Sequence, residues 1–126
     1  MSLTFEELPG LTVTVDQVLY QPELTAPVDR PHPFAYHLSI HNRSQQPLTI
    51  LGGKWIGTDA TGEVLVVEGE GVVGHKPHLD PGQSFSYNSF HVVRESSTAT
   101  GTFFGQTDEG RPVYVRVPEF EMTPPK

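Results

Sequence analysis

A glycine-rich stretch from Gly69 to Gly74 is the part of this sequence whose spacing most resembles a site of known chemistry. It reads Gly-Glu-Gly-Val-Val-Gly, which matches the G-x-G-x-x-G pattern of dinucleotide-binding turns. In those turns a helix follows the glycines, and its N-terminus holds the pyrophosphate. Here Pro77 and Pro81 follow and prevent such a helix. The sequence therefore predicts a loop between strands and not a dinucleotide site.

The same loop offers a weaker anion site, because main-chain N–H groups of a glycine-rich loop can surround an anion without any helix. Gly69, Gly71 and Gly74 would provide that main chain, and Lys76 would add a positive charge. A purely structural interpretation stays open. In it the glycines permit positive φ angles, and the two valines between Gly71 and Gly74 anchor the loop to the core. Acidic residues in the stretch oppose an anion and favour the structural interpretation.

Histidines suggest a metal site at one place only. His37 and His41 would share a strand face but lie about 13 Å apart, too far to bind one ion. His75 and His78 could bind one ion from an irregular turn, with a nearby carboxylate as a further ligand. Such a mixed set suits Co²⁺, Ni²⁺ or Zn²⁺ better than Mg²⁺. The alternative is a pair of solvated histidines in a polar loop.

Catalytic residues are not predicted. The chain has no cysteine and no Gly-x-Ser-x-Gly motif, so the common nucleophiles lack their usual context. Asp59 and Asp108 begin turns, where aspartate caps local N–H groups without any catalytic role. We therefore expect a protein that is not an enzyme.

The elements that position these residues read as β-strands. Phe34 to Asn42 alternates most clearly, with Phe34, Tyr36, Leu38 and Ile40 on a core face. The single tryptophan, Trp55, either fills the core or lines a pocket. Further strands are expected over Leu11 to Tyr20, Leu48 to Asp59, Glu63 to Val67, Phe85 to Val92 with a change of register before Phe90, Thr98 to Gln106 and Val113 to Val117.

About seven strands and no helix predict an all-β fold, an immunoglobulin- or fibronectin type III-like sandwich of two sheets. The length suits a single domain spanning residues 1–126, with an ordered core over about residues 8–121 and mobile ends. An exposed edge strand of such a sandwich could pair two copies, so a homodimer is one expected partner state.

Charge and composition exclude several partners. Fifteen acidic and eight basic residues give a net charge of −7, which disfavours nucleic acid and acidic membranes. No stretch approaches the roughly 20 apolar residues of a membrane span, and the first residues lack the pattern of a signal peptide. We expect a cytoplasmic protein, and the absence of cysteine fits a reducing compartment.

Three blocks together carry a resemblance to a known family: Trp55 to Gly62, Glu68 to Gly74, and Pro77 to Tyr87. In order and spacing they resemble the ApaG family, and the similarity extends over nearly the whole chain. The resemblance implies a fibronectin type III- or immunoglobulin-like sandwich, and no enzymatic activity follows from it. In bacteria the family is linked to cobalt resistance and magnesium efflux. In larger eukaryotic proteins, including an F-box protein, the domain resembles an interaction module.

The residues and the resemblance together lead us to expect one of two functions. The first is a non-enzymatic binding or accessory domain of the ApaG type, which uses the Gly69 to Gly82 loop and the neighbouring strand surface to contact a protein or a small ligand. The second is a sensor of a phosphate-containing small molecule or a divalent cation at the glycine-rich loop. Basic residues usually precede the tryptophan in this family, where this chain has Gly52, Gly53 and Lys54. If those basic residues help to bind an anion, only Lys54 serves that role here.

Overall fold

A computed structural model describes residues 4–125 as a set of β-strands, and no helix occurs among them. Residues 4–125 therefore contain no helix that could cross a membrane. The strands are β1 (Glu6–Glu7), β2 (Leu11–Tyr20), β3 (His32–Asn42), β4 (Leu48–Asp59), β5 (Val64–Glu70), β6 (His78–Leu79), β7 (Ser84–Val93), β8 (Ser97–Thr107) and β9 (Pro112–Met122).

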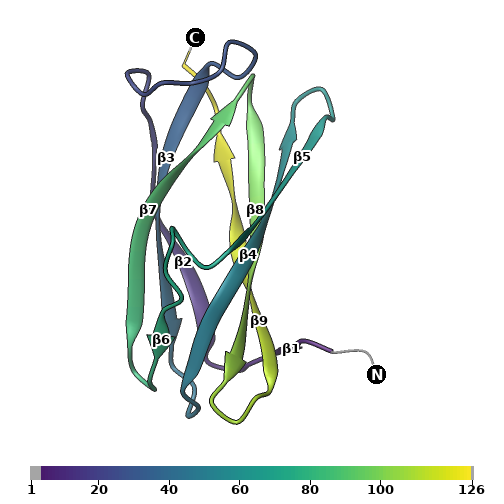
Figure 1. The fold of residues 1–126 in the computed structure, drawn as a ribbon. Helices are drawn as coiled ribbons and strands as arrows, with labels where there is room; N and C mark the ends of the chain where they lie inside the picture. Colours follow the sequence, from purple (N-terminus) through teal and green to yellow (C-terminus); the bar gives the residue numbers. More distant parts are fainter. Residues whose placement is uncertain (1–3, 126) are drawn as a thin grey trace.

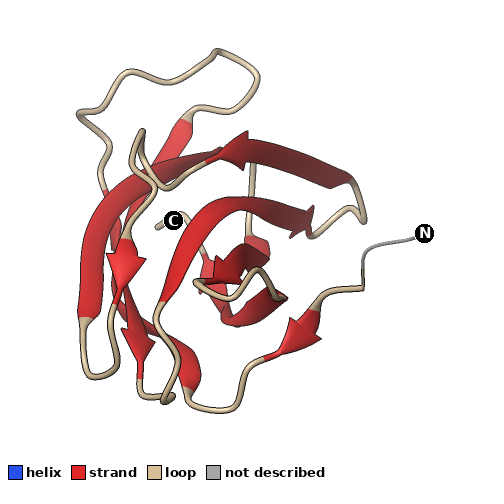
Figure 2. Cartoon of the chain, turned by 60° about the horizontal axis from the view of Figure 1, so that its bottom comes forward, coloured by secondary structure: helices blue, strands red, loops and turns tan. Residues whose placement is uncertain are grey.

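The strands form two sheets that face each other, which confirms the predicted all-β, immunoglobulin-like sandwich (Figures 1 and 2). One sheet has six strands in the order β1-β9-β8-β4-β5, with β6 also paired to β4. The other has three strands in the order β2-β3-β7. Strand β5 is therefore one edge strand of the larger sheet, and β7 is one edge strand of the smaller sheet.

Strand β3 supplies the core as its alternation predicted. Its side chains at Phe34, Tyr36, Leu38 and Ile40 are all buried, with relative exposures between 0% and 4%. Its pairing with β7 is continuous from Ser84 to Val93, so the predicted change of register before Phe90 is wrong. The irregularity in this sheet lies instead in β2, between Val15 and Gln17.

The predicted turn between β4 and β5 is confirmed, and Asp59 organises it. Its Oδ1 accepts hydrogen bonds from the side chain and N–H of Thr61 and from the N–H of Glu63. Its Oδ2 accepts one from Arg94, 2.9 Å away. These bonds, that from the Thr61 hydroxyl foremost, lower the pKa of Asp59 to about 2. The aspartate therefore has the structural role expected of it.

A short strand precedes the predicted core of residues 8–121. Glu6 and Glu7 form β1, which pairs in parallel with Val113 and Tyr114 of β9. Phe5 packs edge-on against Phe104, with ring centroids 5.2 Å apart. Both contacts join the N-terminal segment to residues about a hundred positions later in the chain. The local sequence pattern around residues 5–7 does not reveal them.

Candidate binding cleft between the two sheets

The free edges of the two sheets border a cleft. A cavity of about 210 Å³ lies between them, walled by Leu65 and Val67 of β5 and by Phe90 and Val92 of β7. Three of these wall residues are large apolar side chains with substantial exposure: Leu65 38%, Val67 48% and Phe90 49%. Apolar side chains grouped around a hollow are typical of a binding surface.

Aromatic rings form the floor of this cleft. The rings of Trp55 and His91 lie 4.8 Å apart, and Tyr36 lies 5.2 Å from the first and 4.5 Å from the second. Trp55 can lie flat across the sheet because its neighbour on β8 is Gly101, where a Cβ atom would come within 2.9 Å of the indole. The sequence predicted that Trp55 either fills the core or lines a pocket. In the structure it does both, since it packs against the core and also lines the cleft.

His91 sits in this floor as a neutral ring. Burial lowers its pKa to about 4, because the charged form would lose its hydration there. Its Nε2 is buried and makes no hydrogen bond to any residue in the range 4–125. The floor thus combines an apolar surface with one buried polar atom that has no hydrogen-bond partner among these residues.

Charged groups close the upper end of the cleft, next to the turn between β4 and β5. Nη2 of Arg94 lies 2.9 Å from Asp59 and 2.6 Å from Glu63, and Arg30 approaches Glu63 to 3.6 Å. All four residues line the cavity. Because the carboxylates and guanidinium groups are already paired, this rim fixes the shape of the cleft rather than adding a strong net charge.

The glycine-rich stretch borders the lower part of the same cleft. Gly69 lies within β5, whereas Gly71 and Gly74 lie beyond its end and have φ angles of 68° and 81°. Between them, Val72 is 3% exposed and anchors the loop as predicted, whereas Val73 is 55% exposed, so its predicted anchoring role is wrong. All three glycines line a cavity of about 280 Å³, which shares Trp55 and Val67 with the first one.

Three main-chain N–H groups of this loop are used within the protein. Gly71 donates to the carbonyl of Leu51 at 2.6 Å, and Val72 and His75 donate to each other's carbonyls at 2.6 and 3.0 Å. A ring of N–H groups around an anion needs donors that are free. This hydrogen bonding favours the structural interpretation of the glycines over the anion site.

The charged and histidine residues predicted for this loop have separate surroundings. Lys54 pairs with Glu68 at 3.5 Å, and it points to the outer face because its strand neighbour Trp55 points inward. Lys76 is exposed in the loop after His75. On the outer face Lys54 shares a hollow of about 610 Å³ with Gly69, whereas Gly71 and Gly74 line the cavity on the inner side. The structure therefore does not gather Lys54 and all three glycines around one ligand, and the anion site stays a prediction.

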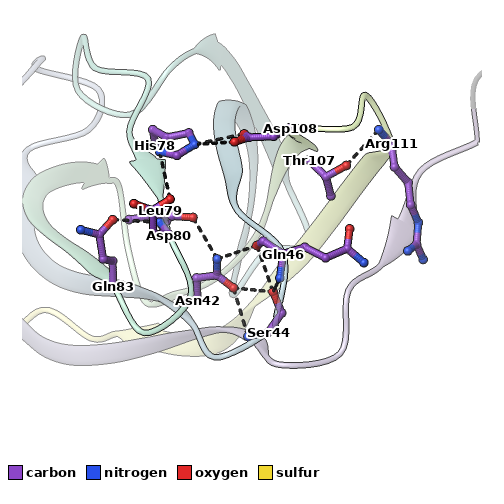
Figure 3. A network of polar contacts seen from close by, with 10 residues as sticks. All are labelled: Asn42, Ser44, Gln46, His78, Leu79, Asp80, Gln83, Thr107, Asp108 and Arg111. Carbon is purple, nitrogen blue, oxygen red and sulfur yellow. Dashed lines mark hydrogen bonds and ion pairs between the residues drawn. The ribbon is translucent and has the colours of Figure 1, made fainter.

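The predicted metal pair is likewise divided. His78 contacts Asp108 at 3.0 Å and Asp80 at 3.8 Å, whereas the ring of His75 lies near Phe85, 6.2 Å between centroids (Figure 3). Within residues 4–125, no group of three histidine or acidic residues is arranged to hold a metal ion. A metal at His75 and His78 stays a prediction without a ligand set to support it.

The conformation of the loop predicts unequal effects for two glycine substitutions. Gly71→Ala is expected to lower the free energy of unfolding by about 2 kcal/mol, because of its positive φ and because a Cβ there would overlap the carbonyl oxygen of His75. Gly69→Ala is the matched control, since a Cβ at this position has no atom within 4 Å. Urea unfolding of both variants checks this expectation, and equal losses would contradict it.

These features define an immunoglobulin-like sandwich with an apolar cleft at its open side. The model of the ApaG domain family matches residues 22–107 of the chain. The chain belongs to the ApaG domain family, which confirms the resemblance inferred from the three sequence blocks. This family is not a known class of enzyme.

Individual relatives agree with this assignment. The chain is 36% identical to Protein ApaG of Ralstonia nicotianae over 117 residues, which cover 92% of this chain and 94% of the relative. It is 35% identical to Protein ApaG of Acidithiobacillus ferrooxidans, over 93% of this chain and 94% of the relative. A crystal structure of an ApaA protein from Bordetella pertussis superposes with a TM-score of 0.82 and 33% identity, over 98% and 99% of the two chains.

Sequence reasoning missed most of the cleft. Leu65, Val67, Phe90 and His91 were not predicted as site residues, although they form its walls and floor. The available signal was the run of four apolar residues in the short strand β5. Such a run usually indicates a strand buried on both faces, yet here every residue of β5 is exposed.

Proposed function

We propose that this chain is a non-enzymatic binding domain that receives apolar side chains of a protein partner in the cleft between β5 and β7. The observation that carries the proposal is the combination of exposed apolar walls and an aromatic floor in one cavity. Exposed apolar surface of this kind is costly in water, so its presence beside a preformed hollow favours a binding role. The association of the ApaG family with cobalt resistance and magnesium efflux would then act through that partner.

Site-directed photo-crosslinking in the native host tests this function. A photoreactive phenylalanine analogue placed at Phe90, in the wall of the cleft, is expected to capture one discrete protein. The same analogue at Gln17, an exposed position on β2 at the far edge of the smaller sheet, is the control and should capture none. A second variant, Leu65→Glu, should abolish capture at position 90 because it puts a charge into the apolar wall.

Two outcomes would refute the proposal. One is capture at Gln17 that equals capture at Phe90. The other is a folded Leu65→Glu variant, verified by its circular dichroism and melting temperature, that still captures the same protein at position 90. Since Leu65 is partly exposed, its replacement should leave the core intact.

A small-ligand sensor is the second candidate, and it rests on the cavity that the glycine loop shares with Tyr36 and Tyr87. Titration with pyrophosphate, a dinucleoside polyphosphate, Co²⁺ and Mg²⁺ tests it through backbone NMR shifts. Shifts at Gly69, Gly71 and Gly74 would support a phosphate-containing ligand, and shifts at the two loop histidines a divalent cation. Unchanged spectra at millimolar ligand would remove this candidate.

A further inference from the structure

Strand β7 has an open edge beside the cleft. Within residues 4–125, β3 is the one strand that pairs with β7, and this pairing is continuous from the first residue of β7 to the last. Lysine, proline and bulges are among the features that keep an edge strand from pairing with another chain. Strand β7 contains no lysine, no proline and no acidic residue, and its register has no bulge. Its edge can therefore accept a further strand.

The hydrogen-bonding groups of this edge follow from the register of β3 and β7. In an antiparallel pair, residues that bond to the partner strand alternate with residues whose N–H and C=O groups face away from it. The N–H of Asn42, at the end of β3, donates to the carbonyl of Gln83 at 2.9 Å. In steps of two along the register, Ser89 and His91 then also bond to β3.

The alternate residues, Phe90 and Val92, turn their N–H and C=O groups outward. Both residues also line the cavity between the two sheets. Their side chains lie on the opposite face of β7 from the ring of His91, which points inward, because side chains alternate along a strand. The cavity therefore reaches the open edge of β7.

The wall opposite this edge is not covered. Leu65 and Val67 of β5 lie on the inner face of the larger sheet, because Val67 pairs with the inward-facing Trp55. These two side chains are nevertheless 38% and 48% exposed. The larger sheet has six strands, whereas the smaller one has three over residues 4–125 and ends at β7. One further strand beside β7 would cover both side chains, since facing sheets pack about 10 Å apart.

We infer that the partner binds through an extended segment that pairs with β7 as a fourth strand of the smaller sheet. The inference rests on the proposed function for its partner and adds how that partner binds. Main-chain hydrogen bonds to Phe90 and Val92 would hold the segment. Every second side chain of the segment would enter the cavity that Leu65 and Val67 line, and the side chains between them would stay on the outer face.

The charges around the cavity define the chemistry of this segment. Arg94 is paired with Asp59 and Glu63, and Arg30 is paired with Glu63. A charged side chain that entered the cavity would therefore lose its hydration without gaining a free counter-charge from these residues. The segment that fits is uncharged, with an apolar residue at every second position.

A segment fused to the full chain tests this pairing without the natural partner. A run of alternating valine and threonine, joined to the C-terminus by a flexible glycine–serine linker, would lie near the cleft because Met122 lines the cavity. The tether keeps the segment at an effective concentration of about 1 mM. The matched control carries the same residues with all the valines before all the threonines, so its composition is equal and its alternation is lost.

Amide hydrogen exchange, followed by NMR, measures the pairing at each residue. With the alternating segment, exchange at the N–H groups of Phe90 and Val92 should slow by about a hundredfold, because these groups become hydrogen-bonded. Exchange at Ser89 and His91 should change by less than about threefold, since their N–H groups already bond to β3.

Three results of this measurement would overturn the inference. The first is unchanged exchange at Phe90 and Val92, and the second is equal slowing at the alternate residues Ser89 and His91 or with the control segment. The third is slow exchange at Phe90 and Val92 in the unmodified chain that grows with protein concentration, since a second copy would then occupy the edge.

Two substitutions in β5 test whether the bound segment enters the cleft. In the fused chain, Leu65→Glu should remove the slowing at Phe90, because it places a charge in the inner wall. Val64→Glu is the matched control and should retain the slowing, because Val64 lies on the outer face of the same strand. Both side chains are partly exposed, so neither change disturbs the core. Equal effects of the two substitutions would contradict the inference.

The fused segment and the crosslinking experiment can fail separately. Slow exchange at Phe90 in the fused chain, with no protein crosslinked in the host, would support a strand-binding edge and refute the proposed partner. A protein crosslinked at position 90, with unchanged exchange in the fused chain, would overturn the added strand and leave the proposed function standing.

Discussion

Replacing Asn42 with alanine is expected to lower the free energy of unfolding by about 4 kcal/mol. Asn42 is completely buried at the end of β3 (Figure 3). Its Nδ2 donates to the carbonyls of Gln46 and Leu79, each at 2.9 Å, and its Oδ1 accepts from the N–H and hydroxyl of Ser44 at 3.1 and 2.6 Å. The truncation would leave these groups without their partner, and buried polar groups without partners are costly.

The Asn42 side chain also fixes the exit of the glycine-rich segment, because Leu79 belongs to β6. Denaturant unfolding of Asn42→Ala measures the loss. Asn88→Ala, at an exposed position on β7, serves as the control and should change stability by no more than about 0.5 kcal/mol. A loss below about 1 kcal/mol at Asn42 would show that the network contributes little to stability.

Acidification is expected to destabilise the protein through His91. The pKa of His91 is about 4 in the folded state, against a usual value of 6.5. At a pH between these two values, His91 therefore binds a proton in the unfolded chain but stays neutral in the folded chain. The contribution of His91 is complete above pH 6.5 and is lost as the pH falls toward 4. A pKa difference of this size corresponds to about 3 kcal/mol.

A His91→Phe variant separates this effect from the titration of carboxylates. Phenylalanine keeps an aromatic ring against Tyr36, Trp55 and Phe120 but cannot take up a proton. Unfolding free energies at pH 7 and pH 4 should therefore fall about 3 kcal/mol less in this variant than in the unmodified chain. Equal losses in both proteins would mean that His91 titrates normally in the folded state.

Local patterns predicted the architecture well because most strands have one buried face. The alternation of β3 identified Phe34 to Ile40 as core, and the Asp59 to Gly62 turn identified the β4–β5 hairpin. Composition also excluded the helix that a dinucleotide site would need after Gly74. These inferences depend on neighbours in sequence, where pattern and turn chemistry are informative.

The cleft could not be predicted in the same way, because it forms where two distant strand edges face each other. His91 and Trp55 come together only when β7 of one sheet lies across β4 of the other. The separation of Lys54 from the glycine loop has the same origin, since the side of the sheet on which each side chain lies depends on register. The glycines were recognised correctly as a loop, but Gly69 belongs to the strand.

We propose that the cleft between β5 and β7 receives a protein partner. The single tryptophan allows a direct test, because Trp55 gives the only indole N–H signal in an NMR spectrum of this chain. Titration with the protein captured at Phe90 should shift that signal together with the methyl signals of Leu65 and Val67. Unchanged signals at these three residues, with shifts on β2 instead, would contradict the claim.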